Sequence, residues 1–206
     1  VVLFSTCVRL RCKIDSSGDI ERVAAVCREC RASEVKVAAS AEEASALMTA
    51  RRAALAALAR LRPTTILEDA SVPRSRLAEM VEAISAIAAK YRLQICTFGH
   101  AGDGNLHPTC LTDARDTEEL ERVESAFAEI FETALALGGT ITGEHGVGAA
   151  KASYLEWRVG PHAVELMRQL KAVFDPHGIL NPGKIFARHT RPRMVLGARG
   201  TAPPRE

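Results

Sequence analysis

Two short apolar runs, residues 93–98 and 106–111, frame a turn that constrains the fold more than any other part of the sequence. Between them lies an Asp-Gly pair, Asp103-Gly104, and this pair is preferred in two-residue type I′ hairpin turns. The runs therefore predict an antiparallel β-hairpin. With Asp103 and Gly104 as the two loop residues, His100 is directly opposite His107, and their Cβ atoms are about 4.5–5.5 Å apart on one face of the sheet.

Helical periodicity and capping residues appear on both sides of this hairpin. Ser40 with Glu43 three residues later is the pattern of a capping box, and Gly138-Gly139 is a helix stop. We expect a turn at 16–19 with Asp19 as the N-cap of the helix that follows it. The expected helices cover residues 20–30, 41–61, 75–91, 117–137, 149–157 and 161–174, and the expected strands cover 8–14, 34–38, 65–72, 93–98 and 106–111. Interleaved helices and strands that include a hairpin predict an α+β fold, a ferredoxin-like antiparallel sheet covered by helices.

Length and composition indicate one globular domain with a tail. The chain has 206 residues, of which 47% are hydrophobic and 25% are charged, as in ordinary folded domains. Residues 187–206 carry five arginines against one glutamate and have no apolar period, so we expect a basic disordered tail after a domain that covers 1–186. This tail has a net charge of +4 in a chain of +2, so the rest is slightly acidic and does not indicate a nucleic-acid partner.

The cysteines and the apolar runs indicate a location. No apolar run approaches the roughly 20 residues of a spanning helix, so we expect no transmembrane segment, and no signal peptide is apparent. The six cysteines include one C-x-x-C pair, Cys27 and Cys30, without a second pair to complete a zinc site. We interpret them as buried or incidental thiols in a reducing, cytoplasmic compartment.

A glycine-rich segment, residues 138–148, carries Glu144 and His145 at its centre. Five glycines in eleven residues let this backbone approach a ligand closely. Together with His100 and His107, Glu144 gives a His-His-Glu set whose open coordination positions are typical of a catalytic metal site, while His145 addresses a substrate. The alternative is that all four are ordinary polar residues of turns. His162, His177 and His189 are expected at the surface.

Three strings carry a family resemblance: FGHAGDGNLHP, GGTITGEHGVG and FDPHGILNPGKIF. In this order they resemble the C-terminal domain of FAD-linked oxidases in the vanillyl-alcohol-oxidase superfamily. That family includes glycolate oxidase catalytic subunits, D-lactate dehydrogenases and D-2-hydroxyglutarate dehydrogenases. The resemblance runs from about residue 14 to residue 186.

The resemblance implies roles by position. His100, His107 and Glu144 correspond to ligands of a divalent ion, usually zinc, and His145 to a general base near the flavin. Arg51, with Arg52 as the alternative, corresponds to the arginine that binds the substrate carboxylate. Asn181 and Lys184 resemble residues that return to the flavin domain and contribute to FAD binding.

The implied reaction is oxidation of a 2-hydroxy acid to the keto acid, with hydride transfer to FAD. In the family FAD is bound mainly by an N-terminal domain that is absent from this sequence, so we expect the chain, which begins at Val1, to be the C-terminal half of the enzyme. Expected partners are an FAD-binding domain or subunit and an electron-acceptor protein or quinone, which could hold the enzyme at the membrane surface. Two alternatives stay open: a non-catalytic metal-binding cap or interaction module, and a stand-alone metal hydrolase.

Overall fold

The computed structural model describes residues 2–4, 7–9, 17–32 and 34–186. The helices of this part are α1 (Ser17–Glu29), α2 (Ala41–Leu58), α3 (Leu77–Tyr91), α4 (Thr117–Ala136) and α5 (Leu155–Phe174). The strands are β1 (Val2–Phe4), β2 (Cys7–Arg9), β3 (Thr64–Leu67), β4 (Ala70–Ser71), β5 (Gln94–His100) and β6 (Asn105–Thr112). Single 3₁₀ turns precede α3 and α5, at Arg74–Arg76 (η1) and Ala152–Tyr154 (η2).

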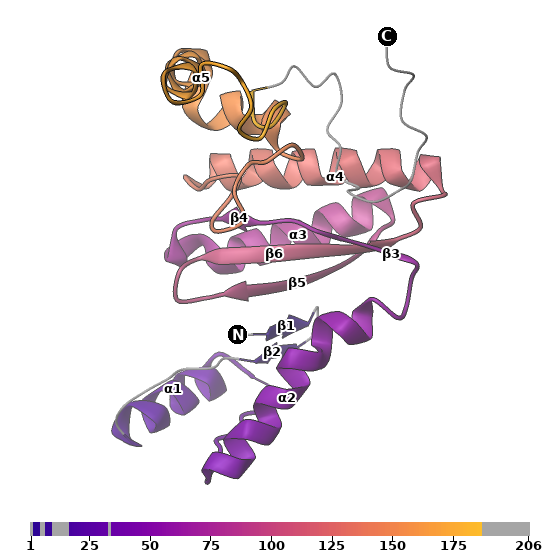
Figure 1. The fold of residues 1–206 in the computed structure, drawn as a ribbon. Coiled ribbons are helices and arrows are strands. Elements are labelled where there is room, and N and C mark those ends of the chain that lie inside the picture. Colours follow the sequence, from indigo (N-terminus) through magenta and orange to yellow (C-terminus); the bar gives the residue numbers. More distant parts are fainter. Residues whose placement is uncertain (1, 5–6, 10–16, 33, 187–206) are drawn as a thin grey trace.

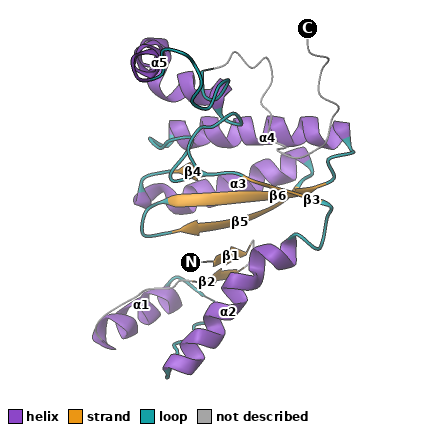
Figure 2. Cartoon of the chain, in the orientation of Figure 1, coloured by secondary structure: helices purple, strands orange, loops and turns teal. Residues whose placement is uncertain are grey.

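The strands form one antiparallel sheet in the order β2-β1-β5-β6-β3, and β4 pairs with β6 beyond the end of β3. Helices α3 and α4 pack against each other and against β5 and β6 (Figure 1). In this view α1 and α2 are drawn below the sheet strands and α4 above them (Figure 2). The expected α+β class, an antiparallel sheet covered by helices, is confirmed.

The core lies between the sheet and the pair α3–α4. Met80 and Ile84 of α3 meet Phe127, Ile130 and Phe131 of α4, and each of these side chains is at most 1% exposed. Strand β6 lies in the interior of the sheet and is buried along its whole length. Side chains alternate between the two faces of a strand. Because Leu106 and Cys110 point into this core, His107 and Thr109 point to the opposite face.

The hairpin forms, but its predicted register is wrong. His100 pairs with Asn105 and Phe98 pairs with His107, so the connection has four residues, 101–104, and not two. Asp103 N donates to His100 O at 2.9 Å, and Gly104 adopts φ +73° where Val72 N donates to its carbonyl. The contact with Val72 comes from a distant part of the chain. The shift is two residues, and since side chains repeat with period 2, His100 and His107 still share a face, as diagonal neighbours.

Local capping signals are confirmed at two helices. Glu43 N donates to Ser40 Oγ at 3.1 Å at the start of α2, and Glu43 Oε2 accepts from Ala39 N at 2.8 Å. Asp116 caps α4 through Glu119 N, at 2.9 Å. Gly138, with φ +81°, follows the end of α4 as expected of a glycine stop.

Other expected boundaries are wrong. Helix α1 begins at Ser17, so Asp19 lies in its first turn and is not the cap, and residues 34–38 form no strand. The expected start at 149 is also wrong, because α5 begins at Leu155, after the turn η2. The two expected helices are found within α5, separated where Gly160 has a non-helical φ of +78° ahead of Pro161. Of the expected strand 8–14, residues 8 and 9 belong to β2 and the rest lie outside the described residues, as does the expected tail, 187–206.

Within the described residues, no helix combines the length and the apolar character that crossing a membrane requires.

Candidate metal centre

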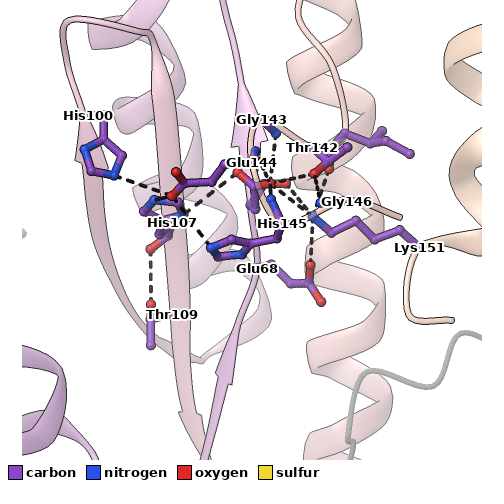
Figure 3. Close-up of polar contacts among 12 residues, drawn as sticks. Glu68, His100, His107, Thr109, Thr142, Gly143, Glu144, His145, Gly146 and Lys151 are labelled. Carbon is purple, nitrogen blue, oxygen red and sulfur yellow. Dashed lines mark hydrogen bonds and ion pairs between the residues drawn. The ribbon is translucent and has the colours of Figure 1, made fainter. Parts of the chain in front are cut away.

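Three segments meet at one face of the sheet. His100 ends β5, His107 lies on β6, and Glu144 and His145 come from the glycine-rich loop after α4 (Figure 3). The loop is joined to the sheet by an antiparallel bridge between Ser71 and Thr140. Gly143 lies so close that a Cβ atom there would be 2.3 Å from Ser71 Oγ, so a larger residue would push the loop away.

The carboxylate of Glu144 lies between two imidazoles. Its Oε1 is 3.0 Å from His107 Nε2 and 3.5 Å from His100 Nε2. One ligand atom from each of these three residues lies within 4.8 Å of the others, which is the spacing expected around a single metal ion. His107 is buried, whereas the side chains of His100 and Glu144 are 40% and 51% exposed, so the set has a buried side and an open side.

Burial also affects the protonation of the His107 imidazole. Desolvation lowers the pKa of its imidazole, and the nearby negative charge of Asp69 opposes this effect without cancelling it. A neutral imidazole offers a lone pair, which is the form that binds a metal. The donor set and the state of its buried member therefore fit a divalent transition-metal ion.

His145 stacks on His107. Their ring centroids are 4.8 Å apart and the planes are inclined by 12°. His145 Nε2 lies 3.8 Å from Glu144 Oε1, and the side chain is 40% exposed. This places a partly exposed imidazole beside the predicted ligands, on the same side as Glu144.

Asp69 is a residue of the site that the sequence analysis missed. Its side chain is fully buried, and Oδ2 accepts hydrogen bonds from Thr142 Oγ1 at 2.6 Å and from the backbone N–H of Gly143, Glu144 and His145 at 2.8, 3.1 and 2.9 Å. Burial alone would raise the pKa of this carboxyl, but these donors and the charge of Lys151 hold it at about 2. One carboxylate therefore holds the backbone of both Glu144 and His145.

Lys151 was also missed, and it supplies the counter-charge. Only 3% exposed, its Nζ donates to the carbonyls of Asp69 and Ile141 at 2.8 and 3.1 Å. It also lies 3.3 Å from Glu68 Oε2 and 3.8 Å from Asp69 Oδ2. Burial raises the pKa of Glu68, against the attraction of Lys151. The available signal was the acidic pair Glu68-Asp69 inside an otherwise apolar extended run.

The other predicted site residues are not brought to the imidazoles by any contact among the described residues. Arg51 lies within α2, and its side chain is outside the described part. Arg52 is exposed and donates to Thr49 Oγ1 at 3.4 Å. Asn181 and Lys184 lie in an exposed turn, which is joined to the glycine-rich loop where Ile185 N donates to Gly148 O at 3.1 Å.

The remaining histidines and cysteines that the structure describes are not among the groups with metal-ligand spacing. His162 and His177 are exposed, as expected, and His189 lies outside the described residues. Cys27, Cys30, Cys96 and Cys110 are free thiols, of which Cys110 is buried and Cys30 is exposed. In the part of the chain that the structure describes, the groups with metal-ligand spacing contain no cysteine.

Comparison with known proteins identifies relatives over most of the chain. The family model of FAD linked oxidases, C-terminal domain, matches residues 12–185. The glycolate oxidase subunit GlcD of Bacillus subtilis (strain 168) is 63% identical over 177 residues, which are 86% of this chain and 38% of that protein. The subunit of the same name from Escherichia coli (strain K12) is 34% identical over 82% of this chain and 34% of its own length. A D-2-hydroxyglutarate dehydrogenase of Stutzerimonas stutzeri (strain A1501) is 43% identical over 58% of this chain and 26% of its own length. The chain thus spans less than two fifths of the length of these relatives.

Proposed function

We propose a function from the family to which this chain belongs, the FAD linked oxidases, C-terminal domain. The chain is the metal- and substrate-binding part of an FAD-dependent 2-hydroxy-acid dehydrogenase or oxidase, of the glycolate or D-lactate type. The observation that carries the proposal is the convergence of His100, His107 and Glu144, with His145 stacked beside them. Two imidazoles and one carboxylate with an open side are typical of catalytic sites, whereas structural zinc sites have four protein ligands.

His100, His107 and Glu144 would hold a divalent ion, most simply zinc, through two ring nitrogens and one carboxylate oxygen. Such an ion, when bound, supplies a Lewis acid that lowers the pKa of a coordinated hydroxyl group. The contribution of the chain is to keep the three donors together before a ligand arrives. Asp69 and Lys151 support this arrangement from the buried side.

His145 is the proposed general base. Its Nε2 takes the proton of the substrate hydroxyl, which an imidazole can do near neutral pH. FAD, held mainly by another domain or subunit, would accept the hydride from the carbon that carries this hydroxyl group. The hydrogen bond from His145 N to Asp69 Oδ2 holds the backbone that carries this ring.

The remaining roles follow the family pattern. Arg51, or Arg52, would bind the substrate carboxylate in bidentate fashion and fix its orientation. Asn181 and Lys184 would face the FAD-binding part. An electron-acceptor protein or quinone, and a cytoplasmic location at or near the membrane, complete the proposal.

The test is oxidation of glycolate and of D-lactate by the chain assembled with its FAD-binding domain or subunit, followed by reduction of a dye acceptor. We expect His145→Gln to lower kcat by about 10²–10⁴-fold, the range in which a general base contributes. His162→Gln, the same exchange at an exposed histidine of α5, is the matched control and should leave kcat unchanged.

The visible spectrum of bound FAD and the zinc content should be the same in both variants. Near-normal turnover of His145→Gln would contradict the assigned base. If the wild-type assembly bound zinc but oxidised neither acid nor any other 2-hydroxy acid, the chain would instead be a metal-binding cap or interaction module.

A further inference from the structure

Two buried polar atoms face each other across the site without a hydrogen bond. Asp69 Oδ1 and His107 Nδ1 have no hydrogen-bond partner among the described residues, and they lie 3.9 Å apart. The Asp69 side chain is fully buried and that of His107 is 10% exposed, so water does not readily solvate either atom. Leaving two such groups unpaired is costly, and a shift of about 1 Å would bring them into hydrogen-bond range.

We propose that Asp69 is a positioning residue that accepts the Nδ1–H of His107 and thereby fixes the tautomer in which Nε2 is free to bind the metal. This inference rests on the proposed metal site. Metal-binding histidines commonly donate their second ring N–H to a carboxylate, which orients the ring and raises its basicity as a ligand. The ring nitrogen that lies 3.0 Å from Glu144 Oε1 is Nε2, so Nε2 faces the proposed metal position while Nδ1 faces Asp69.

The same carboxylate acts on a second segment. While Oδ1 faces His107 on β6, Oδ2 accepts from the backbone N–H groups of Glu144 and His145 in the glycine-rich loop. Asp69 therefore sets the distance between a ligand on the sheet and a ligand on the loop. Lys151 keeps the carboxylate charged in a buried place, because its Nζ lies 3.8 Å from Oδ2 and donates to the Asp69 carbonyl.

Asp69→Asn separates these two actions. The amide oxygen can take the place of Oδ2 and still accept from the loop, while the amide NH₂ replaces Oδ1. An NH₂ group donates, so it favours the tautomer of His107 with a bare Nδ1 and a protonated Nε2, which cannot bind the metal through Nε2. We expect the zinc affinity of the purified protein, measured by competition with a chromogenic chelator, to fall about 10–100-fold.

Thr142→Val is the matched control. It removes one donor from Asp69 Oδ2 and the acceptor of Gly146 N, and it leaves Oδ1 and His107 untouched. We expect it to lower the melting temperature but to change the zinc affinity by less than about threefold. If Asp69→Asn also stays within that range, or if both variants lose affinity equally, the carboxylate acts only on loop structure and the inference is wrong.

The tautomer of His107 in the wild-type protein is an independent test of the role of Asp69. It remains available if Asp69→Asn does not fold. In ¹⁵N spectra of the zinc-bound protein we expect His107 to carry its proton on Nδ1 and to bind zinc through Nε2. Zinc bound to Nδ1, or an Nδ1 without a proton, would overturn the inference. If His100→Asn left the zinc affinity unchanged, the proposed metal site would fail, whereas zinc held at this site by a His107 with an unprotonated Nδ1 would count against Asp69 alone.

Discussion

Gly102 and Gly104 lie in the same turn but meet different surroundings. At Gly104 a Cβ atom would be 2.0 Å from the carbonyl oxygen of Val72, and φ is +73°. At Gly102 nothing lies within 4 Å, and φ is not in the left-handed region. The close contact at Gly104 joins the hairpin to the segment that follows β4, so it also supports the position of His100.

Gly104→Ala is therefore expected to lower the free energy of unfolding by about 2 kcal/mol or more, through strain at positive φ and displacement of the Val72 backbone. Gly102→Ala should stay within about 0.5 kcal/mol of the wild type. Urea unfolding followed by circular dichroism measures both. Equal losses in the two variants would show that the contact with Val72 is unimportant.

Cys110 makes the stability depend on pH in the alkaline range. Its side chain is 0% exposed, and burial, with a smaller contribution from Glu119, raises the pKa of the thiol from 9.0 to about 12. The folded chain thus binds this proton more tightly than the unfolded chain, so stability is lost as the pH rises from 9 towards 12. At pH 11 the loss from this group is about 2.7 kcal/mol.

Cys110→Ala should remove that loss. The variant is expected to be less stable than wild type at pH 8, because a buried sulfur atom is missing, and to close this gap at pH 11. Denaturant titrations of both proteins at the two pH values check it. A difference in unfolding free energy that is the same at both pH values would contradict the raised pKa.

At the scale of elements, α4 depends on its cap. Asp116 Oδ1 accepts from Glu119 N at 2.9 Å, and α4 carries Phe127, Ile130 and Phe131 into the core. Asp116→Ala should lower the free energy of unfolding by about 1 kcal/mol. Thr117→Ala, one residue further at an exposed position, is the control and should change it by less than about 0.5 kcal/mol. Thermal or urea unfolding would contradict the prediction if both variants behaved alike.

The elements that the sequence predicts well are those defined by neighbouring residues. The cap at Ser40 and the glycine stop at Gly138 depend on residues within a turn of one another, and they are found as expected. The hairpin register is different. Asp103-Gly104 has the composition of a two-residue turn, but Gly104 is used for the contact with Val72, which lies outside the hairpin. A two-residue shift keeps side chains on their face, so the shared face of His100 and His107 could be predicted although their pairing could not.

Some residues of the candidate site could be predicted from the sequence and others could not. His100, His107, Glu144 and His145 were identified because imidazoles and carboxylates near glycines are chemically conspicuous. Asp69 was not, because it acts on the backbone N–H of residues more than seventy positions away, and such contacts have no spacing in the sequence. The acidic pair Glu68-Asp69 in an apolar run was visible, but nothing in it indicates its partner Lys151.

At the scale of the whole molecule, the three candidate ligands come from two parts of the fold that are distant in the sequence. His100 and His107 belong to the sheet, while Glu144 belongs to the loop that leads from α4 towards α5. An ion that binds all three stabilises only the folded arrangement, because the unfolded chain does not hold them together. At a free zinc concentration 100-fold above Kd, this linkage adds about 2.7 kcal/mol to the free energy of unfolding.

For a chain of 206 residues this corresponds to a rise in the melting temperature of about 5–10 °C in zinc-buffered solution. The double variant His100→Asn/Glu144→Gln retains all six cysteines, so it corrects for zinc that binds to thiols of the unfolded chain. Calorimetry should show no rise for this variant. An equal rise in both proteins would mean that zinc binds elsewhere. His100, His107 and Glu144 would then be ordinary polar residues that do not bind a metal.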